Sequence, residues 1–365
     1  MADSSMVPDS PPLANGTSCA SPPSSSRAAT KSNSHTSSVS SVDLDSDGII
    51  RESYQSRGLS PEVAGFLLHS WRESTREQYG SHIKKWLSFC FGRKIDLFQP
   101  SSADLLDFLL SEFRRGAGRT YSSINTLRSA ISAVASINGQ PAGQHPLATR
   151  FMKAVFQVRP SLPRYGTTWD PHLILDHIIG LGPDKDLSLI QLSRKLTILM
   201  LLLSGQRGQT LHMLDIRNMT VSDSRVSFRI GDPLKTSRPG THLSELVFVA
   251  YPPDRRLCVV TSTMSYLERT NNMRGSLTGF FLTTRPPVKL ASRDTLRRWT
   301  KDVMRAAGIN LGIFSPHSTR SASASKAALR LPLSTIISTI GWTRESTFTK
   351  YYRKPIIDAG LTWSW

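Results

Sequence analysis

The chain has 365 residues, 39% of them hydrophobic, and a formal net charge of +18 from 45 Lys and Arg against 27 Asp and Glu. This length allows two or three domains, and the hydrophobic share excludes a wholly disordered protein. The longest apolar run, Ile198 to Leu203, is far shorter than the roughly 20 residues of a membrane span, so no membrane partner is expected. The N-terminus lacks a secretory signal pattern. The basic excess indicates an anionic partner.

Residues 1–50 differ in composition from the rest of the chain. They are rich in Ser and Pro, have no aromatic residue, and carry two basic and five acidic side chains. Such a segment cannot bury enough apolar surface to offset chain entropy. We predict a disordered Ser/Pro-rich tail over residues 1–52, and the net charge beyond residue 50, about +21, then falls on the folded part.

Residues 53–160 predict a bundle of four or five helices, because apolar side chains recur there at helical spacing. Lys84, Lys85, Arg93 and Lys94 lie off the apolar stripe of one of these helices. They are candidates for contact with DNA, and a solvated helix face explains them equally well.

Two prolines and a glycine between Arg159 and Asp170 predict a linker, over residues 161–170. Residues 171–357 then mix helices and strands, and residues 358–365 are predicted to be a C-terminal tail. Leu187 to Leu203 predicts a helix whose second half is buried on all sides. Apolar alternation before and after a turn predicts a β-hairpin with Lys235 in its connection.

His317 and Arg320 are the most informative pair for chemistry. Ser315 is suited to cap a helix and Pro316 to its first position, which puts His317 and Arg320 on one face of the first turn. A helix N-terminus attracts anions, so this pair would add an arginine and a proton-transfer group to an anion site. A surface His beside a surface Arg is the alternative.

Other candidates are individually weak. Arg207 follows the buried helix at a Gly-flanked turn, where an arginine could also bond to the last carbonyls. Lys235 could be an ordinary turn lysine. Trp342 and one of the adjacent tyrosines, Tyr351 and Tyr352, could be core aromatics.

Taken in order, these residues resemble the catalytic signature of the tyrosine recombinase (phage-integrase-like) family. The signature is Arg, a hairpin Lys, His-x-x-Arg, Gly-His/Trp, and Tyr nine residues later. It is matched here by Arg207, Lys235, His317, Arg320, Trp342 and Tyr351. The local sequences around Arg207, Lys235, His317 and Tyr351 are most similar to recombinases of DIRS-like retrotransposons of animals. The similarity covers roughly residues 55–357.

The resemblance implies a mostly α fold with a small β-sheet. A helical, SAM-like core-binding domain over residues 53–160 would precede an α+β catalytic domain over residues 171–357. It also implies double-stranded DNA as substrate, a homotetramer on two DNA sites, and integration of a mobile element. No cofactor and no metal are implied, and the protein would be nuclear if its source is eukaryotic. Arg238, in the turn that holds Lys235, is added to the DNA-binding residues.

The same resemblance implies a role for each site residue. The tyrosine would attack a DNA phosphodiester and form a 3′-phosphotyrosyl link. Arg207 and Arg320 would hold the non-bridging oxygens, and His317 would assist proton transfer. Lys235 would protonate the leaving 5′-oxygen, and Trp342 would donate its indole N–H to the phosphate.

Two departures from the family pattern are present. Thr210 stands where the family often has an acidic residue, and two adjacent tyrosines compete for the role of nucleophile. The spacing from Trp342 favours Tyr351, with Tyr352 as the alternative. The competing functions are a type IB topoisomerase, which the helical bundle argues against, and a catalytically inactive DNA-binding protein with the same fold. The three cysteines lie too far apart for a disulfide framework or a cysteine zinc site, which indicates a reducing compartment.

Overall fold

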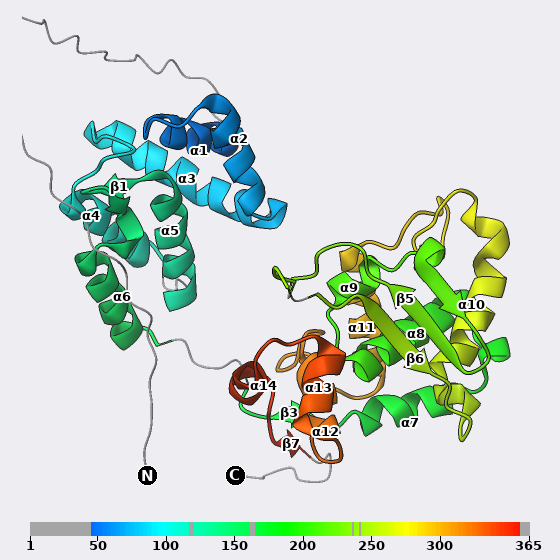
Figure 1. The fold of residues 1–365 in the computed structure, drawn as a ribbon. Helices are drawn as coiled ribbons and strands as arrows, with labels where there is room; N and C mark the ends of the chain where they lie inside the picture. The colour runs from blue at the N-terminus through cyan, green and yellow to red at the C-terminus, as the bar shows by residue number, and fades with distance from the viewer. Residues whose placement is uncertain (1–44, 117–119, 161–164, 236, 241, 358–365) are drawn as a thin grey trace, which may run out of the picture. The chain divides into compact units, whose positions relative to one another are not determined.

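The computed structural model describes residues 45–116, 120–160, 165–235, 237–240 and 242–357, and the chain divides into two compact units, residues 1–161 and 162–365 (Figure 1). Helices dominate both units and the strands form only small sheets. This confirms the predicted fold class. Residues 1–44 of the predicted tail and the whole predicted C-terminal tail lie outside the described residues. No helix in the described ranges has both the length and the apolar character to cross a membrane.

The first unit is a bundle of helices with one small hairpin. Its helices are α1 (Ser46–Gln55), α2 (Pro61–Leu67), α3 (Glu73–Arg93), α4 (Ser102–Arg114), α5 (Tyr121–Val134) and α6 (Pro146–Val158), and its strands are β1 (Ser136–Ile137) and β2 (Gln140–Pro141). The apolar faces of these helices meet in one core, in which Trp86 and Ile131 are fully buried. Asn138 and Gly139 turn the hairpin with positive φ angles of 52° and 76°, the conformation that Asn-Gly favours.

Helix α1 belongs to this bundle, although the sequence predicts a tail as far as residue 52. Ile49 and Ile50 are buried in the core of the first unit, and Asp47 pairs with Arg76 of α3 at 2.8 Å. The sequence does not predict this helix, because the residues before it are rich in Ser and Asp and two adjacent isoleucines do not form a helical pattern. Their burial against other helices stabilises α1.

Replacing Ile50 with Ala is expected to lower the free energy of unfolding by about 2–5 kcal/mol, because the side chain is fully buried and its removal leaves a cavity. Urea denaturation followed by circular dichroism measures the change. Val63→Ala is the matched control, since Val63 of α2 is 45% exposed. Equal unfolding midpoints for the two variants would show that α1 is not part of the core.

The second unit is built around helix α8. Its helices are α7 (His172–Gly180), α8 (Leu189–Ser204), α9 (Gly208–His212), α10 (Val259–Arg274), α11 (Arg293–Ala306), α12 (Ser318–Ala327), α13 (Leu333–Ile340) and α14 (Glu345–Tyr351). Helix α8 contacts α9, α10, α11, α12 and strand β6 (Glu245–Val249), and its residues 195–202 are buried. The predicted burial on all sides is confirmed for residues 195–202 and is wrong at Leu203, which is 57% exposed. The position of α8 makes it a rigid base for the turn that follows it.

The predicted β-hairpin is confirmed and extended by a third strand. Strands β4 (Met219–Val221), β5 (Arg225–Arg229) and β6 form an antiparallel sheet in that order. Val226 pairs with Phe248 and Phe228 with Leu246, and all four side chains face the core. The long β5–β6 connection carries Lys235 in an exposed turn.

The second half of the predicted linker is part of the second unit. Strand β3 (Thr168–Trp169) pairs in parallel with β7 (Ile356–Ile357) near the end of the described chain. The buried Trp169 donates its indole N–H to Ser318 Oγ at 2.8 Å. The sequence could not predict this pair, because each strand has two residues and the partners lie far apart. Through the β3–β7 pairing and the Trp169–Ser318 hydrogen bond, strand β3 links the segment after α14 to the start of α12.

Candidate active site

Helix α12 begins later than the sequence predicts. Ser315 and Pro316 lie in a turn, and the N–H groups of Ser318 and Thr319 bond to the carbonyls three residues earlier. Helix α12 itself starts at Ser318, so His317 precedes it and Arg320 lies in its first turn. The tighter turn is stabilised by the Ser318 hydroxyl, which donates to the Ser315 carbonyl at 2.7 Å.

Arg320 lies at the centre of the candidate site. It is 1% exposed, and its Nη1 donates to the Gly205 carbonyl at 2.7 Å. Its guanidinium carbon lies 4.8 Å from the ring centre of Trp342 and 5.2 Å from that of Tyr352. Nε and Nη2 are buried without a hydrogen-bond partner among the described residues. Burial and the charge of Arg207 lower the pKa of Arg320 to about 10, so it stays a cation at neutral pH with two donors to spare.

The turn between α8 and α9 positions Arg207. Gly205 ends α8 with a φ of 59°, and a Cβ there would meet Ile340 at 2.8 Å, so only glycine fits. The next residue, Gln206, donates its side-chain amide to the Ile340 carbonyl at 3.0 Å. Arg207 is thereby held beside Tyr352, whose hydroxyl accepts a hydrogen bond from Nη2 at 3.4 Å.

The structure brings Tyr352, and not Tyr351, into this cluster. Tyr352 is 8% exposed and stacks on Trp342, with ring centres 4.8 Å apart. Tyr351 is 57% exposed and its ring lies near Lys350. Phe348, buried four residues before Tyr352, sets the register of α14, because positions four apart share a helix face. The sequence spacing places Tyr351 in the cluster, and the packing of Phe348 turns its side chain away.

Trp342 supports the Tyr352 ring by stacking on one of its faces. It is 6% exposed and follows Gly341, which ends α13 with a φ of 72°. Its Nε1 is buried without a hydrogen-bond partner in the described part of the chain. As the alternative interpretation of these aromatics expects, Trp342 packs with Phe348 and Tyr352 in one buried cluster. Trp342 therefore both packs the site and supplies it with a free donor.

His317 lies beside the same cluster, 6.2 Å from Tyr352 between ring centres. Burial and the positive charges of Arg207, Arg320 and Lys235 lower its pKa below the usual 6.5. The exposed Lys235 is thus close enough for its charge to act on His317. The imidazole is neutral at pH 7 and can accept a proton.

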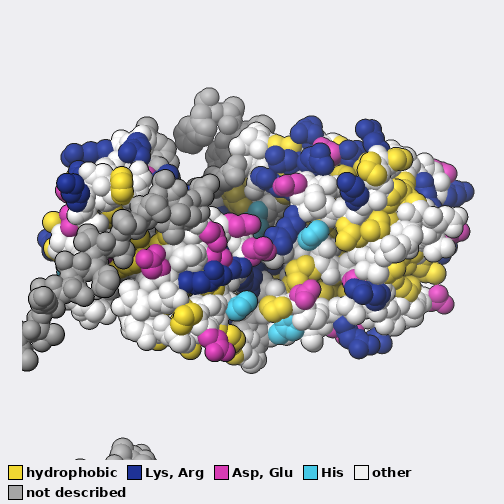
Figure 2. Space-filling model, turned by 90° about the horizontal axis from the view of Figure 1, so that it is seen from above, with side chains coloured by type: hydrophobic (Ala, Val, Ile, Leu, Met, Phe, Trp, Pro, Cys, Tyr) yellow, Lys and Arg dark blue, Asp and Glu magenta, His cyan; other side chains and the backbone are white. Residues whose placement is uncertain are grey.

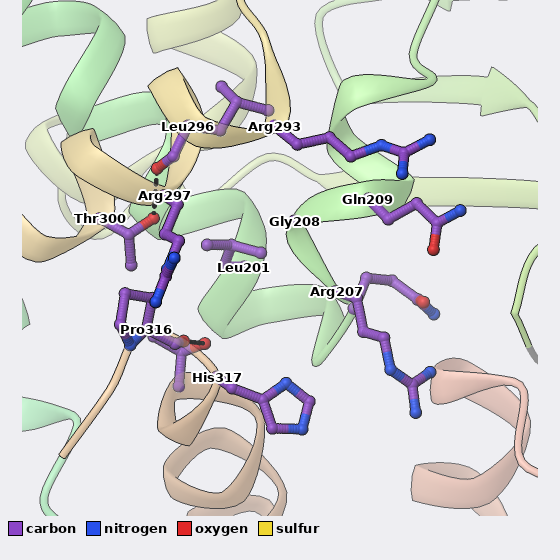
Figure 3. Close-up of a pocket in the computed structure, with 12 residues that line it drawn as sticks. Leu201, Arg207, Gly208, Gln209, Arg293, Leu296, Arg297, Thr300, Pro316 and His317 are labelled. Carbon is purple, nitrogen blue, oxygen red and sulfur yellow. Dashed lines mark hydrogen bonds between the residues drawn. The ribbon is translucent and has the colours of Figure 1, made fainter. Parts of the chain in front are cut away.

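A cavity of about 220 Å³ opens next to Arg207 and His317 (Figure 3). Arg293 and Arg297 of α11 also line it, and neither forms an ion pair with a described residue. The sequence does not single out these two arginines. The only sequence feature that could point to them is their spacing of four residues, and arginines with this spacing are common on solvated helices. Only the placement of α11 against the α8–α9 turn aims them at the site.

The predicted DNA-binding lysines and arginines of α3 fall into two groups. Lys85 lies 3.8 Å from the buried carboxylate of Glu112, and Arg93 pairs with Asp107 at 3.2 Å. Lys84 and Lys94 are exposed. Arg238 is exposed in the same turn as Lys235. Contact between these five residues and DNA stays a prediction. The face drawn in Figure 2 shows Lys and Arg side chains gathered in several groups.

The described residues contain no group of three or more His, Cys, Asp or Glu able to hold a metal ion. The cluster around Tyr352 contains two guanidinium groups, an indole N–H, a neutral imidazole and a phenol hydroxyl. Such a set can bind a tetrahedral anion and move a proton from the phenol.

No protein-family model and no curated protein sequence matches this chain. Solved structures are similar in fold. The XerH site-specific recombinase, bound to a palindromic difH substrate in a post-cleavage complex, is 11% identical and gives a TM-score of 0.54. The match covers 86% of this chain and 94% of that chain. The Tn1549 transposon integrase in complex with transposon right end DNA is 13% identical and gives a TM-score of 0.52. That match covers 85% of this chain and 95% of the integrase. The chain therefore has the fold of the tyrosine recombinases.

Proposed function

We propose that this protein is a site-specific DNA recombinase or integrase that breaks and rejoins DNA through a 3′-phosphotyrosyl intermediate on Tyr352. One observation carries the proposal. The buried Arg320 has two donors without a partner, Trp342 has another, and the Tyr352 hydroxyl lies against Arg207. Buried donors without partners are costly, and a bound phosphate would satisfy them. The similar folds of XerH, bound to difH, and of the Tn1549 integrase, bound to transposon DNA, support DNA as the source of that phosphate.

In the proposed reaction, the Tyr352 oxygen attacks the phosphorus and the bond from phosphorus to the 5′-oxygen breaks. His317 takes the phenol proton, and Lys235 gives a proton to the leaving 5′-oxygen. Arg207 and Arg320 bind the non-bridging oxygens, where charge is spread in the transition state, and Trp342 donates its indole N–H. Each preorganised donor of this kind contributes on the order of 3–4 kcal/mol. The phosphotyrosyl bond keeps the energy of the broken bond, so a 5′-hydroxyl of another strand can reverse the step.

Three finer parts of the proposal concern biological role, assembly and metal use. The similarity of local sequence to DIRS-like retrotransposon recombinases supports integration of a mobile element, and in a eukaryotic host this requires entry into the nucleus. Exchange between two DNA sites requires four active tyrosines, hence a homotetramer. Two arginines and an indole at the phosphate supply the charge stabilisation for which other enzymes use a metal ion, which supports a metal-independent reaction.

Covalent trapping tests the proposed function. The protein is mixed with a pool of nicked, random-sequence duplexes in EDTA and quenched in SDS, and the protein-linked DNA is isolated and sequenced. We expect an SDS-resistant adduct in EDTA with an enriched cleavage sequence. An adduct that forms only with added magnesium would contradict metal independence. Duplex binding in a gel shift without any adduct would support the inactive DNA-binding alternative.

Replacing Lys235 with Met is expected to raise the pKa of His317 toward 6.5, because one of the positive charges that lower it is removed. In the native protein, His317 stays neutral below the pH at which an unfolded His becomes protonated. The contribution of His317 to stability is therefore present above pH 6.5 and is lost as the pH falls toward its lowered pKa. NMR titration of the imidazole signals measures the pKa, and His317→Gln identifies the signal. An unchanged pKa would place Lys235 too far from His317 to act in the site.

A further inference from the structure

A second cavity, of about 440 Å³, lies along the exposed flank of α14. Every residue that lines it carries a positive charge or a hydroxyl group: Arg238, Arg344 and Lys350, with Thr343, Ser346, Thr347 and Tyr351. No carboxylate lines it, and Glu345, the acidic residue of α14, is not among the lining residues. We call this cavity the α14 cleft. Three positive charges, hydroxyl groups that can donate, and the lack of a carboxylate make this surface favour anions.

The cations of the α14 cleft have no acidic partner among the described residues. Neither Arg238 nor Arg344 forms an ion pair there, and the contact found for Lys350 is the ring of Tyr351 at 5.4 Å. By contrast, Lys326 in the same unit pairs with Asp170 at 2.7 Å. Three like charges around one cleft repel one another, and a bound anion would offset this repulsion with favourable electrostatic attraction.

The neighbouring site indicates which anion would bind. Tyr351 lines the α14 cleft and Tyr352 lies in the catalytic cluster, so the two sites are presented by consecutive residues, whose Cα atoms are about 3.8 Å apart. Along one DNA strand, successive phosphates advance by about 3.4 Å of helix axis. A strand bound with one phosphate at Tyr352 brings its neighbouring phosphates to the surface around that site, and the cleft that Tyr351 lines is part of this surface. DNA would therefore bind the cleft together with the catalytic cluster, whereas a free anion would bind the cleft alone.

We propose that the α14 cleft binds a second backbone phosphate of the same DNA, next to the phosphate that Tyr352 attacks. This inference rests on the proposed function and deepens it. Arg238, Arg344 and Lys350 would act as positioning residues. Binding DNA on this flank holds α14 in place, and α14 carries Tyr352 at its end. The cleft also gives Tyr351 a role, since its hydroxyl becomes a donor to the second phosphate.

The first experiment measures binding of a fluorescent random-sequence duplex over a range of salt concentrations. The double variant Arg344→Ala/Lys350→Ala is expected to bind more weakly and to lower the salt slope, by about 0.9 for each phosphate that the protein no longer neutralises. Arg330→Ala/Lys289→Ala is the charge-matched control, because both residues are exposed in the same unit and lie outside the cleft. Equal slopes for the two double variants would overturn the proposal. This test stands even if the native protein forms no adduct, so it separates the cleft from the proposed function.

The second experiment locates the phosphate. In the cleavage sequence found by covalent trapping, each phosphate beside the cleaved one is replaced in turn with an uncharged methylphosphonate. One such replacement is expected to slow adduct formation by the native protein at least tenfold, and to have a much smaller effect on Arg344→Ala/Lys350→Ala, because that variant has already been deprived of the cations that bind the phosphate. Equal slowing of both proteins at every position would show that the cleft does not hold a backbone phosphate.

Discussion

Replacing Tyr352 with Phe is expected to abolish the covalent protein–DNA adduct, whereas Tyr351→Phe still forms it at a reduced rate. The reason is geometric. The Tyr352 hydroxyl lies beside Arg207, and its ring stacks on Trp342 and lies near the Arg320 guanidinium. Tyr351 is 57% exposed on the other flank of α14. The measurement is the yield of SDS-resistant adduct on the enriched duplex in EDTA.

Both substitutions keep the aromatic ring, so each variant is expected to fold like the native protein and to bind the duplex in a gel shift. A native-like circular dichroism spectrum confirms this for each. If the adduct is lost in Tyr351→Phe and kept in Tyr352→Phe, the nucleophile is Tyr351, and α14 must turn on binding DNA. Loss in both would mean that the pair acts together.

Removing either arginine of the site has the second large effect. Arg207→Ala and Arg320→Ala are each expected to slow adduct formation on saturating DNA by about 10²–10³-fold, because each removes donors aimed at the non-bridging oxygens. Arg320→Lys is expected to restore little of the rate, since an ammonium group cannot reproduce the planar fork that lies near both the Trp342 ring and the Tyr352 ring. Rapid-quench measurement of a single turnover gives the rate constants.

Arg320 is fully buried, so its loss could also weaken the fold, whereas Arg207 is only half-buried and tests the same role with less effect on packing. Arg330→Ala, on the exposed end of the segment after α12, is the control for charge. If Arg207→Ala cleaves as fast as Arg330→Ala, the proposed clamp on the phosphate is wrong.

The sequence by itself determined much of the fold, because the patterns concerned are local. Helical spacing predicts the bundle of the first unit, and Ser101 and Asp104 form a capping box at the start of α4. Alternation of apolar residues predicts strands β5 and β6. The order of Arg207, Lys235, His317 and Arg320 along the chain resembles the tyrosine recombinase signature, and that resemblance implies phosphate chemistry.

What the tertiary structure decided depends on contacts between distant segments. Helix α1 forms because Ile49 and Ile50 are buried against other helices, which composition cannot show. Arg293 and Arg297 reach the site because α11 packs against α8 and α9.

The position of Tyr352 in the cluster has the same origin. Counting from Trp342 favours Tyr351, but α14 is oriented by the burial of Phe348, and that packing brings Tyr352 to Arg207. A shift of one residue turns a helical side chain by about 100°, so spacing along the sequence cannot assign the nucleophile while the register of the helix is unknown. The sequence determines which groups are available for the chemistry, and packing determines which of them meet.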